Sequence, residues 1–259
     1  MARKCHRLES SGRLKLLDLL ERDLPKHVTC YKCERLHAIK DSKYYMEPRK
    51  SSFSWQPRLV VTPSCYEDDR KTSLGFYIHH DFSLIVAKMA LEQYREGAEY
   101  LKLLDLLSLQ TQYRYYSQGY LENVTVLCRI VDEVLLVRKQ SIFIVKPQEN
   151  KPFDIWGFMI CPHIGWLAGI TANSMHLIRC QYCATEFQIE IESINEQKFA
   201  VILTKWHSFG GYALFQNRDW LNLGHNGNYL SWKRYRFRLG SIRAAFEGTM
   251  SVDCISLNA

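Results

Sequence analysis

The segment CQYCATEFQIEIESI, residues 180–194, joins two cysteines in C-x2-C spacing to a run in which polar and apolar residues alternate. Two thiolates on such a turn can converge on one metal ion, while the alternation predicts a β-strand with one buried face. Upstream, the chain carries Cys161-Pro162-His163. Thiolate and imidazole ligands suit zinc better than calcium or magnesium. We therefore predict a closed, structural zinc site of ribbon-like form, made by Cys161, His163, Cys180 and Cys183.

A second C-x2-C pair, Cys30-Tyr31-Lys32-Cys33, is followed by His37 and, further along, by Cys65. These four residues predict another zinc site, a knuckle in the N-terminal region, with His79 or His80 as competing fourth ligands. Alternatively, the two C-x2-C pairs meet at one four-cysteine site. The number of zinc ions bound per chain separates these cases. We interpret three further cysteines as small buried residues: Cys5, Cys128 and Cys254.

The composition is that of a globular protein. The chain has 259 residues, of which 47% are hydrophobic, and this is enough for a substantial core. No apolar run approaches the roughly 18–20 residues that cross a bilayer, and the first residues carry no export signal. We expect an intracellular protein, cytoplasmic or nuclear, that binds no membrane. In such a reducing compartment closely spaced cysteines indicate metal ligands rather than disulfides.

Helical patterns come first along the chain and strand patterns follow. Residues 13–24 predict an amphipathic helix with an apolar stripe made by Leu16, Leu17, Leu20 and Leu24. A second helical block covers 81–107 with a break at Gly97. The later pattern predicts a loop at 112–120, a hairpin over 121–145 that turns at Asp132-Glu133, and further strands at 58–62, 185–194, 200–206 and 229–238.

This order predicts an α+β fold with a mostly antiparallel sheet in its C-terminal part. The helical region with the first cysteine pair would cover residues 1–110 and the β-rich region 111–259, although the two could form one continuous domain.

Basic and aromatic residues alternate in WKRYRFR, residues 232–238. In a strand, Arg234, Arg236 and Arg238 would share one face, which suits contacts with nucleic-acid phosphates. The alternative is an edge strand whose arginines are solvated and prevent aggregation. A net charge of +7 is modest for a nucleic-acid binder and favours this second interpretation. No phosphate-binding loop, nucleophile elbow or zinc-protease motif is present.

Seven segments, taken together and in order, resemble the F-box-like proteins of filamentous fungi. They are LLDLLERDLPKHVTCYKCERLH (16–37), MALEQYREG (89–97), ICPHIGWL (160–167), CQYCATEFQI (180–189), TKWHSFGG (204–211), RDW (218–220) and GSIRAAFEG (240–248). The resemblance extends along nearly the whole chain, and the family's cysteines and His163 match residue by residue. It implies an N-terminal F-box, which docks on the Skp-type adaptor of a cullin ubiquitin ligase, followed by a target-binding region.

The chain departs from the family at its start, because only residues 1–12 precede the first predicted helix. An F-box needs several helices, and helices average about 11–12 residues each. The F-box is therefore absent or lost upstream, which argues against a Skp-type adaptor as partner and against a ubiquitin-ligase adaptor role. The expectation is a non-catalytic, zinc-stabilised module that binds an unidentified protein partner. The alternatives are an enzyme with an open zinc site or a reactive thiol, and a weak nucleic-acid binder acting through 232–238.

Overall fold

The computed structural model describes residues 10–30, 33–45, 78–79, 82–115, 120–145, 158–161, 163–166, 176–195, 198–210 and 236–249. Within this part of the chain, helices dominate the first half and antiparallel strands the second, which confirms the α+β class. The predicted strand at 58–62 lies outside the described residues.

The N-terminal elements come first. Helix α1 (Ser10–Asp23) is followed by the hairpin β1 (His27–Cys30) and β2 (Arg35–Ala38), and by the 3-10 helix η1 (Ile39–Tyr45). Helices α4 (Leu84–Arg95) and α5 (Leu101–Leu107) form the helical block predicted over 81–107. Gly97 lies between them with φ of 66°, a left-handed conformation that glycine adopts without strain, so the predicted break is confirmed.

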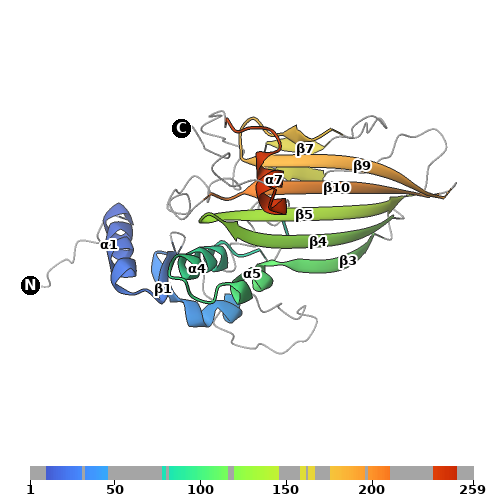
Figure 1. The fold of residues 1–259 in the computed structure, drawn as a ribbon. Helices are drawn as coiled ribbons and strands as arrows, with labels where there is room; N and C mark the ends of the chain where they lie inside the picture. Colours follow the sequence, from blue (N-terminus) through green and yellow to red (C-terminus); the bar gives the residue numbers. More distant parts are fainter. Residues whose placement is uncertain are drawn as a thin grey trace, which may run out of the picture.

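A six-stranded antiparallel sheet forms the body of the molecule, with strand order β3-β4-β5-β10-β9-β8 (Figure 1). Its strands are β3 (Leu109–Tyr115), β4 (Tyr120–Val131), β5 (Val134–Val145), β8 (Ile178–Arg179), β9 (Thr185–Asn195) and β10 (Lys198–Ser208). The β4–β5 hairpin turns at Asp132 and Glu133, both at positive φ, as a two-residue hairpin turn requires. The hairpin and the strands at 185–194 and 200–206 are confirmed.

The loop predicted over 112–120 is wrong for residues 112–115, which belong to β3, and for Tyr120, which begins β4, while 116–119 lie outside the described residues. This segment is rich in tyrosine and glutamine and shows no apolar alternation. It forms a strand because it pairs along β4, with Gln112 opposite Asn123 and their side-chain amides hydrogen-bonded at 2.8 Å. Pairing with a neighbouring strand has overridden the weak local preference.

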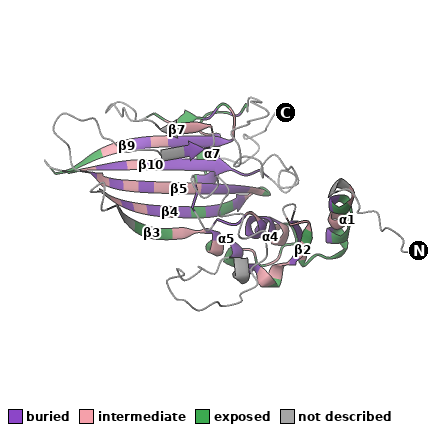
Figure 2. Ribbon diagram, turned by 180° about the vertical axis from the view of Figure 1, so that it is seen from behind, coloured by how far each residue is buried: buried purple, intermediate pink, exposed green. Residues whose placement is uncertain are grey.

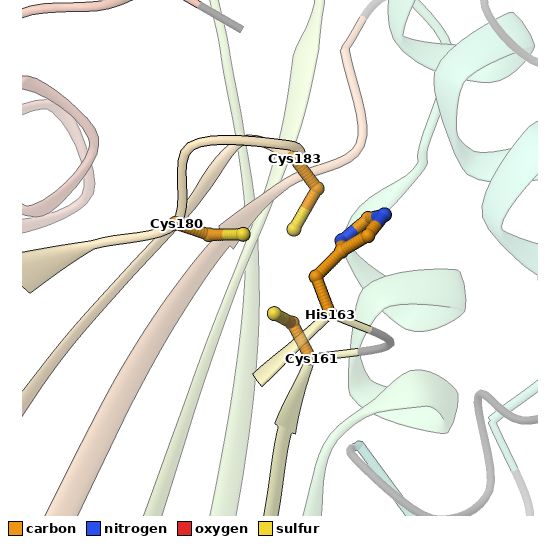
Figure 3. Close-up of side chains that lie close together, drawn as sticks. All are labelled: Cys161, His163, Cys180 and Cys183. Atoms are coloured by element: carbon orange, nitrogen blue, oxygen red, sulfur yellow. The ribbon is translucent and has the colours of Figure 1, made fainter. Parts of the chain in front are cut away.

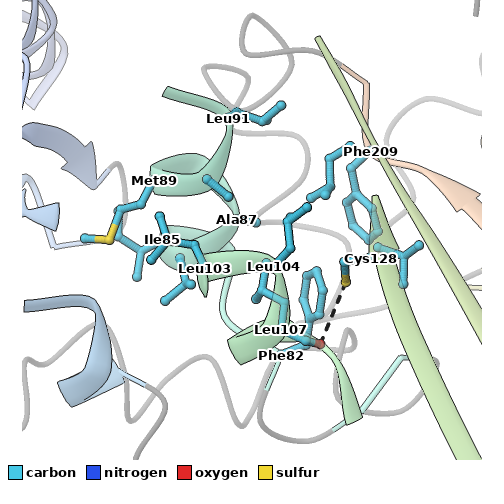
Figure 4. Close-up of a cluster of buried hydrophobic side chains, with 14 of the residues drawn as sticks. Phe82, Ile85, Ala87, Met89, Leu91, Leu103, Leu104, Leu107, Cys128 and Phe209 are labelled. Carbon is cyan, nitrogen blue, oxygen red and sulfur yellow. Dashed lines mark hydrogen bonds between the residues drawn. The ribbon is translucent and has the colours of Figure 1, made fainter. Parts of the chain in front are cut away.

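One face of the sheet carries two apolar clusters. The first packs α4 and α5 against β4 and the start of β5 (Figure 4). Its members include Val28, Phe82, Ile85, Met89, Leu103, Leu107, Val126 and Val137. Because this cluster contains residues from both predicted regions, the helices and the sheet share a core.

The second cluster packs a small hairpin onto the same face. The hairpin consists of β6 (Phe158–Cys161) and β7 (Ile164–Trp166), and Figure 1 shows it beside β9. Ile160 is fully buried against side chains of β5, β9 and β10. Ile164 packs against the same cluster. This hairpin matters because it delivers Cys161 and His163 to the sheet.

The opposite face is covered at one end by α7 (Ser241–Glu247), a helix that the sequence analysis did not predict (Figures 1 and 2). Phe246 and Ile242 pack on Leu136 and Trp206. The carboxylate of Glu186 is fully buried and accepts hydrogen bonds from the backbone N–H groups of Gly240, at 2.5 Å, and Arg243, at 2.9 Å. It therefore fixes the start of α7.

Helix α1 confirms the helix predicted at 13–24 but starts three residues earlier, at Ser10, and ends at Asp23, and the predicted apolar stripe is wrong. The helix turns Leu14 and Glu21 inward, whereas Leu16, Leu19 and Leu20 are 48%, 56% and 37% exposed. The reason is an ion pair: Lys88 Nζ of α4 donates to Glu21 Oε2 at 3.0 Å and to the carbonyl oxygen of Thr29 at 3.0 Å. This buried contact orients α1 with its leucines outward.

Lys88→Met is expected to lower the free energy of unfolding by about 3–5 kcal/mol, because the Glu21 carboxylate would stay buried without its cation. The double variant Glu21→Leu/Lys88→Met should recover most of this loss. Lys102→Met, which removes an exposed ion pair with Glu99, serves as the control and should leave the urea midpoint unchanged. Equal effects of the buried and exposed substitutions would contradict the role given to Lys88.

Glu186→Ala should release α7 and cost about 1–2 kcal/mol, because two buried N–H groups lose their acceptor. Amide hydrogen exchange should accelerate over 241–249 while β4 and β5 keep their protection. Glu190→Ala, on the same strand but away from α7, is the matched control. Unchanged protection of α7 in Glu186→Ala would refute this account of its docking.

Candidate metal centres

Cys161, His163, Cys180 and Cys183 converge on one small volume (Figure 3). Their ligand atoms all lie within 4.8 Å of one another. A tetrahedral zinc ion with Zn–S bonds of about 2.3 Å places its sulfur ligands about 3.8 Å apart, so this spacing fits one central ion. Cys161 and Cys180 are fully buried, and His163 and Cys183 are partly exposed. The four residues could therefore hold a metal ion.

Two turns build this centre. Cys161 ends β6 and His163 lies in the turn before β7, so the two ligands converge across a hairpin. Cys180 and Cys183 lie in the short connection between β8 and β9. There the backbone N–H of Tyr182 points at Cys180 Sγ, at 3.3 Å.

Backbone hydrogen bonds hold the second turn against β9. The N–H of Cys180 donates to the carbonyl oxygen of Thr185 at 2.9 Å, and the N–H of Thr185 donates to the carbonyl oxygen of Cys183 at 2.8 Å. The C-x2-C turn is therefore anchored at the first residue of a sheet strand. It is positioned by the alternating run that follows it in the sequence.

The electrostatics of the three thiols favour a cation. Hydrogen bonds from Cys161 and Cys183 hold the pKa of Cys180 far below its usual range. The interaction with Cys180 is also the main cause that raises the pKa of Cys161 to about 12, and interactions with Cys161 and Cys180 raise that of Cys183 well above its usual value. Without a metal, only one of the three thiols ionises easily. A bound divalent cation would offset the charge of all three thiolates.

Nearer the N-terminus, Cys30, Cys33 and His37 form another group, called the first group below, whose ligand atoms also lie within 4.8 Å of one another; the Cys161, His163, Cys180 and Cys183 group is called the second centre. Cys30 ends β1 and His37 lies on β2, where it pairs with Val28. The chain reverses through Glu34, at φ of 53°, and the N–H of Glu34 donates to the carbonyl oxygen of Cys30 at 2.9 Å. This tight reversal brings Cys33 Sγ to 3.0 Å from His37 Nε2.

The pKa of His37 is likewise shifted by neighbouring thiols. Burial, the largest single influence, lowers its pKa, but hydrogen bonds and charge interactions with Cys30 and Cys33 outweigh it and raise the pKa to about 9. In the absence of a metal the imidazole is thus protonated near neutral pH. A metal ion would replace that proton and bind the neutral ring, so binding would release protons.

Among the described residues, no fourth candidate ligand joins this first group. Cys65 and His80, two of the predicted candidates, lie outside them. His79 is not in the group: its Nε2 lies 2.9 Å from the carbonyl oxygen of Leu107, and its ring packs edge-on against Phe82. His79 belongs to the apolar core beneath α4 and α5.

The two C-x2-C pairs form separate groups, so the single four-cysteine site is not what the described residues build. Cys128 is a buried core thiol, as expected. It lies in the first apolar cluster, its Sγ is 3.8 Å from the carbonyl oxygen of Leu107, and burial raises its pKa to about 12. Cys5 and Cys254 lie outside the described residues.

The sequence analysis missed two residues beside the centre. Thr185 Oγ1 is 3.1 Å from Cys183 Sγ and 3.0 Å from His207 Nδ1. Nothing in a lone threonine or histidine marks such a role. The available signal was position, because Thr185 follows Cys183 by two residues at the start of a strand.

The predicted basic surface is only partly described. Arg234 lies outside the described residues, while Arg236 and Arg238 are exposed and belong to no strand. Phe237 between them is buried against α7, and its carbonyl oxygen accepts a hydrogen bond from Arg179. The strand predicted at 229–238 is therefore absent at 236–238, because the segment leads directly into the start of α7.

Comparison with protein-family models, with curated proteins and with solved structures finds no match to this chain. Among the helices that the structure describes, none combines the length and the apolar character that crossing a bilayer requires. The class of the site is accordingly defined by its geometry alone: two groups of cysteine and histidine residues, one with four ligands and one with at least three, each able to hold a metal ion.

The two groups should bind metal independently. Titration of the reduced, metal-free protein with Co²⁺ should give thiolate-to-cobalt charge-transfer absorption with two equivalents bound. The variant Cys161→Ala should lose one equivalent, Cys30→Ala/Cys33→Ala should lose the other, and Cys128→Ala should retain both. A single equivalent in the unmodified protein, abolished by either change, would instead support one shared site.

Proposed function

We propose that Cys161, His163, Cys180 and Cys183 hold a structural Zn²⁺ ion, and that the first group holds another. The convergence of four soft ligands carries this proposal. Three thiolates and an imidazole match the donor set of structural zinc sites, and four protein ligands leave no position for a reacting water. This supports a scaffold role over the alternative of an enzyme with an open zinc site. The origin of the four ligands in two facing turns also fits a ribbon-like zinc site.

The ion would fasten the β6–β7 hairpin to the sheet. The hairpin strands have only four and three residues, and an isolated two-stranded hairpin is marginal in water. The apolar contacts of Ile160 and Ile164 hold one side of it, and the ion would hold the turn. Because the ligands come together only in the folded chain, the free energy of zinc binding would add to stability.

An interaction role is supported by the exposed leucines of α1. Leu16, Leu19 and Leu20 lie on the helix and Leu24 directly follows its last residue, and each is between 37% and 56% exposed. In Figure 1 this helix projects from the body of the molecule. Together with the resemblance to F-box-like proteins, this favours a non-catalytic, intracellular protein-interaction module, with α1 as the contact for an apolar groove of a protein partner.

Zinc removal should destabilise the protein. Under reducing conditions a strong chelator is expected to lower the melting temperature, and re-addition of zinc should restore it. Cys180→Ser should have a comparable effect and abolish the response at its own site, whereas the core control Cys128→Ala should still respond to the chelator. Chelator-insensitive stability in a protein shown to contain zinc would argue against the scaffold role.

The interaction role has its own test. Proteins cross-linked to the unmodified chain in the cells that express it should be compared with those cross-linked to Leu16→Ser/Leu20→Ser. The account expects a partner whose contact peptides map to α1 and whose capture falls at least tenfold in the variant, with melting temperature and zinc content unchanged. Identical partners and yields would remove α1 as the contact surface.

A further inference from the structure

A short chain of hydrogen bonds leads from the second metal centre into the sheet. Thr185 Oγ1 lies 3.1 Å from Cys183 Sγ on one side and 3.0 Å from His207 Nδ1 on the other. Thr185 and His207 are direct partners in the pairing of β9 with β10, so the backbone fixes their separation. Both side chains are buried, at 2% and 5% exposure. No bulk water competes for these contacts.

The direction of these hydrogen bonds follows from counting protons. A threonine hydroxyl has one proton, so it donates to one neighbour and accepts from the other. A cysteine bound to a metal is a thiolate, which has no proton and can only accept. Thr185 must then donate to Cys183 Sγ and accept from His207, and this requires the proton of the imidazole to be on Nδ1.

The His207 imidazole is neutral, so only one of its two ring nitrogens carries a proton. Burial is the main cause that lowers its pKa well below the usual value, and the charges of Lys205 and Lys139 act in the same direction. A neutral imidazole carries its proton on either Nδ1 or Nε2, and the hydrogen bond at one nitrogen selects the tautomer. Here the nitrogen that faces Thr185 is Nδ1.

We infer that Thr185 and His207 are positioning residues of the metal centre, and that a metal-bound Cys183 thiolate fixes His207 in its Nδ1–H tautomer. The inference rests on the proposed metal site. Thr185 and His207 thereby hold the Cys183 sulfur from adjacent strands of the sheet.

The hydrogen bonds that join Cys183, Thr185 and His207, called the relay below, should also strengthen metal binding. A Zn²⁺ ion with three thiolates and one imidazole carries a net charge of −1, and hydrogen-bond donors to sulfur offset it. The structure supplies the N–H of Tyr182 for Cys180 and the hydroxyl of Thr185 for Cys183. Loss of such an outer partner typically costs 10–100-fold in metal affinity.

The test uses the full chain labelled with ¹⁵N-histidine and loaded with zinc, whose stoichiometry is measured first. Long-range ¹H–¹⁵N spectra, with the His207 signals assigned from His207→Gln, report which ring nitrogen carries the proton. The account expects Nδ1–H in the zinc-loaded protein. In Thr185→Val this preference should disappear, and the zinc affinity of the second centre should fall about tenfold. Thr185→Ser, which keeps the hydroxyl, should preserve both properties.

Thr204→Val is the matched control. Thr204 is a buried β10 threonine whose hydroxyl oxygen accepts from Gln140 at 3.2 Å, and it should change neither the tautomer nor the affinity. An Nε2–H tautomer in the zinc-loaded protein, or unaltered zinc affinity in Thr185→Val, overturns the relay while the metal site stands. Failure of the unmodified chain to bind zinc at the Cys161 centre overturns both.

Discussion

The repulsion among clustered thiolates is the constraint on which the rest of the structure depends. Cys161, Cys180 and Cys183 are too close to ionise together, and their shifted pKa values reflect this. Burial removes the water that would screen their charges. A divalent cation is the simplest compensation, and two turns from distant parts of the chain bring together four residues that could hold one. In this account the charge balance of one buried centre holds a hairpin on the sheet and orders the contacts beside it.

The centre is integrated into the sheet through short-range geometry. The C-x2-C turn leads directly into β9, and the hairpin that carries Cys161 and His163 packs on the same sheet face. Thr185, the first residue of β9, contacts both Cys183 and His207. The first group is also built next to a short turn, with Cys30 and His37 on adjacent strands of one hairpin. In each case a tight turn next to a strand provides the ligands.

Local patterns predicted most of what is local. Apolar alternation identified β9 and the hairpin at Asp132-Glu133, and cysteine spacing identified both groups of candidate ligands. The features that these local patterns missed depend on partners distant in the sequence. β3 is a strand because β4 pairs with it. Helix α7 starts at the point where the backbone N–H of Gly240 donates to the Glu186 carboxylate. The buried Lys88 reverses the orientation expected for α1. Such contacts leave no periodic signal in the sequence.

The central claim is most directly tested by an anomalous difference map at the zinc edge, from a crystal of the protein purified without chelator. The account predicts a peak bonded to three sulfurs at about 2.3 Å and one imidazole nitrogen at about 2.0–2.1 Å, at the Cys161, His163, Cys180 and Cys183 centre, with no water ligand. A map without a peak there, or with the three cysteines directed to different places, would contradict it.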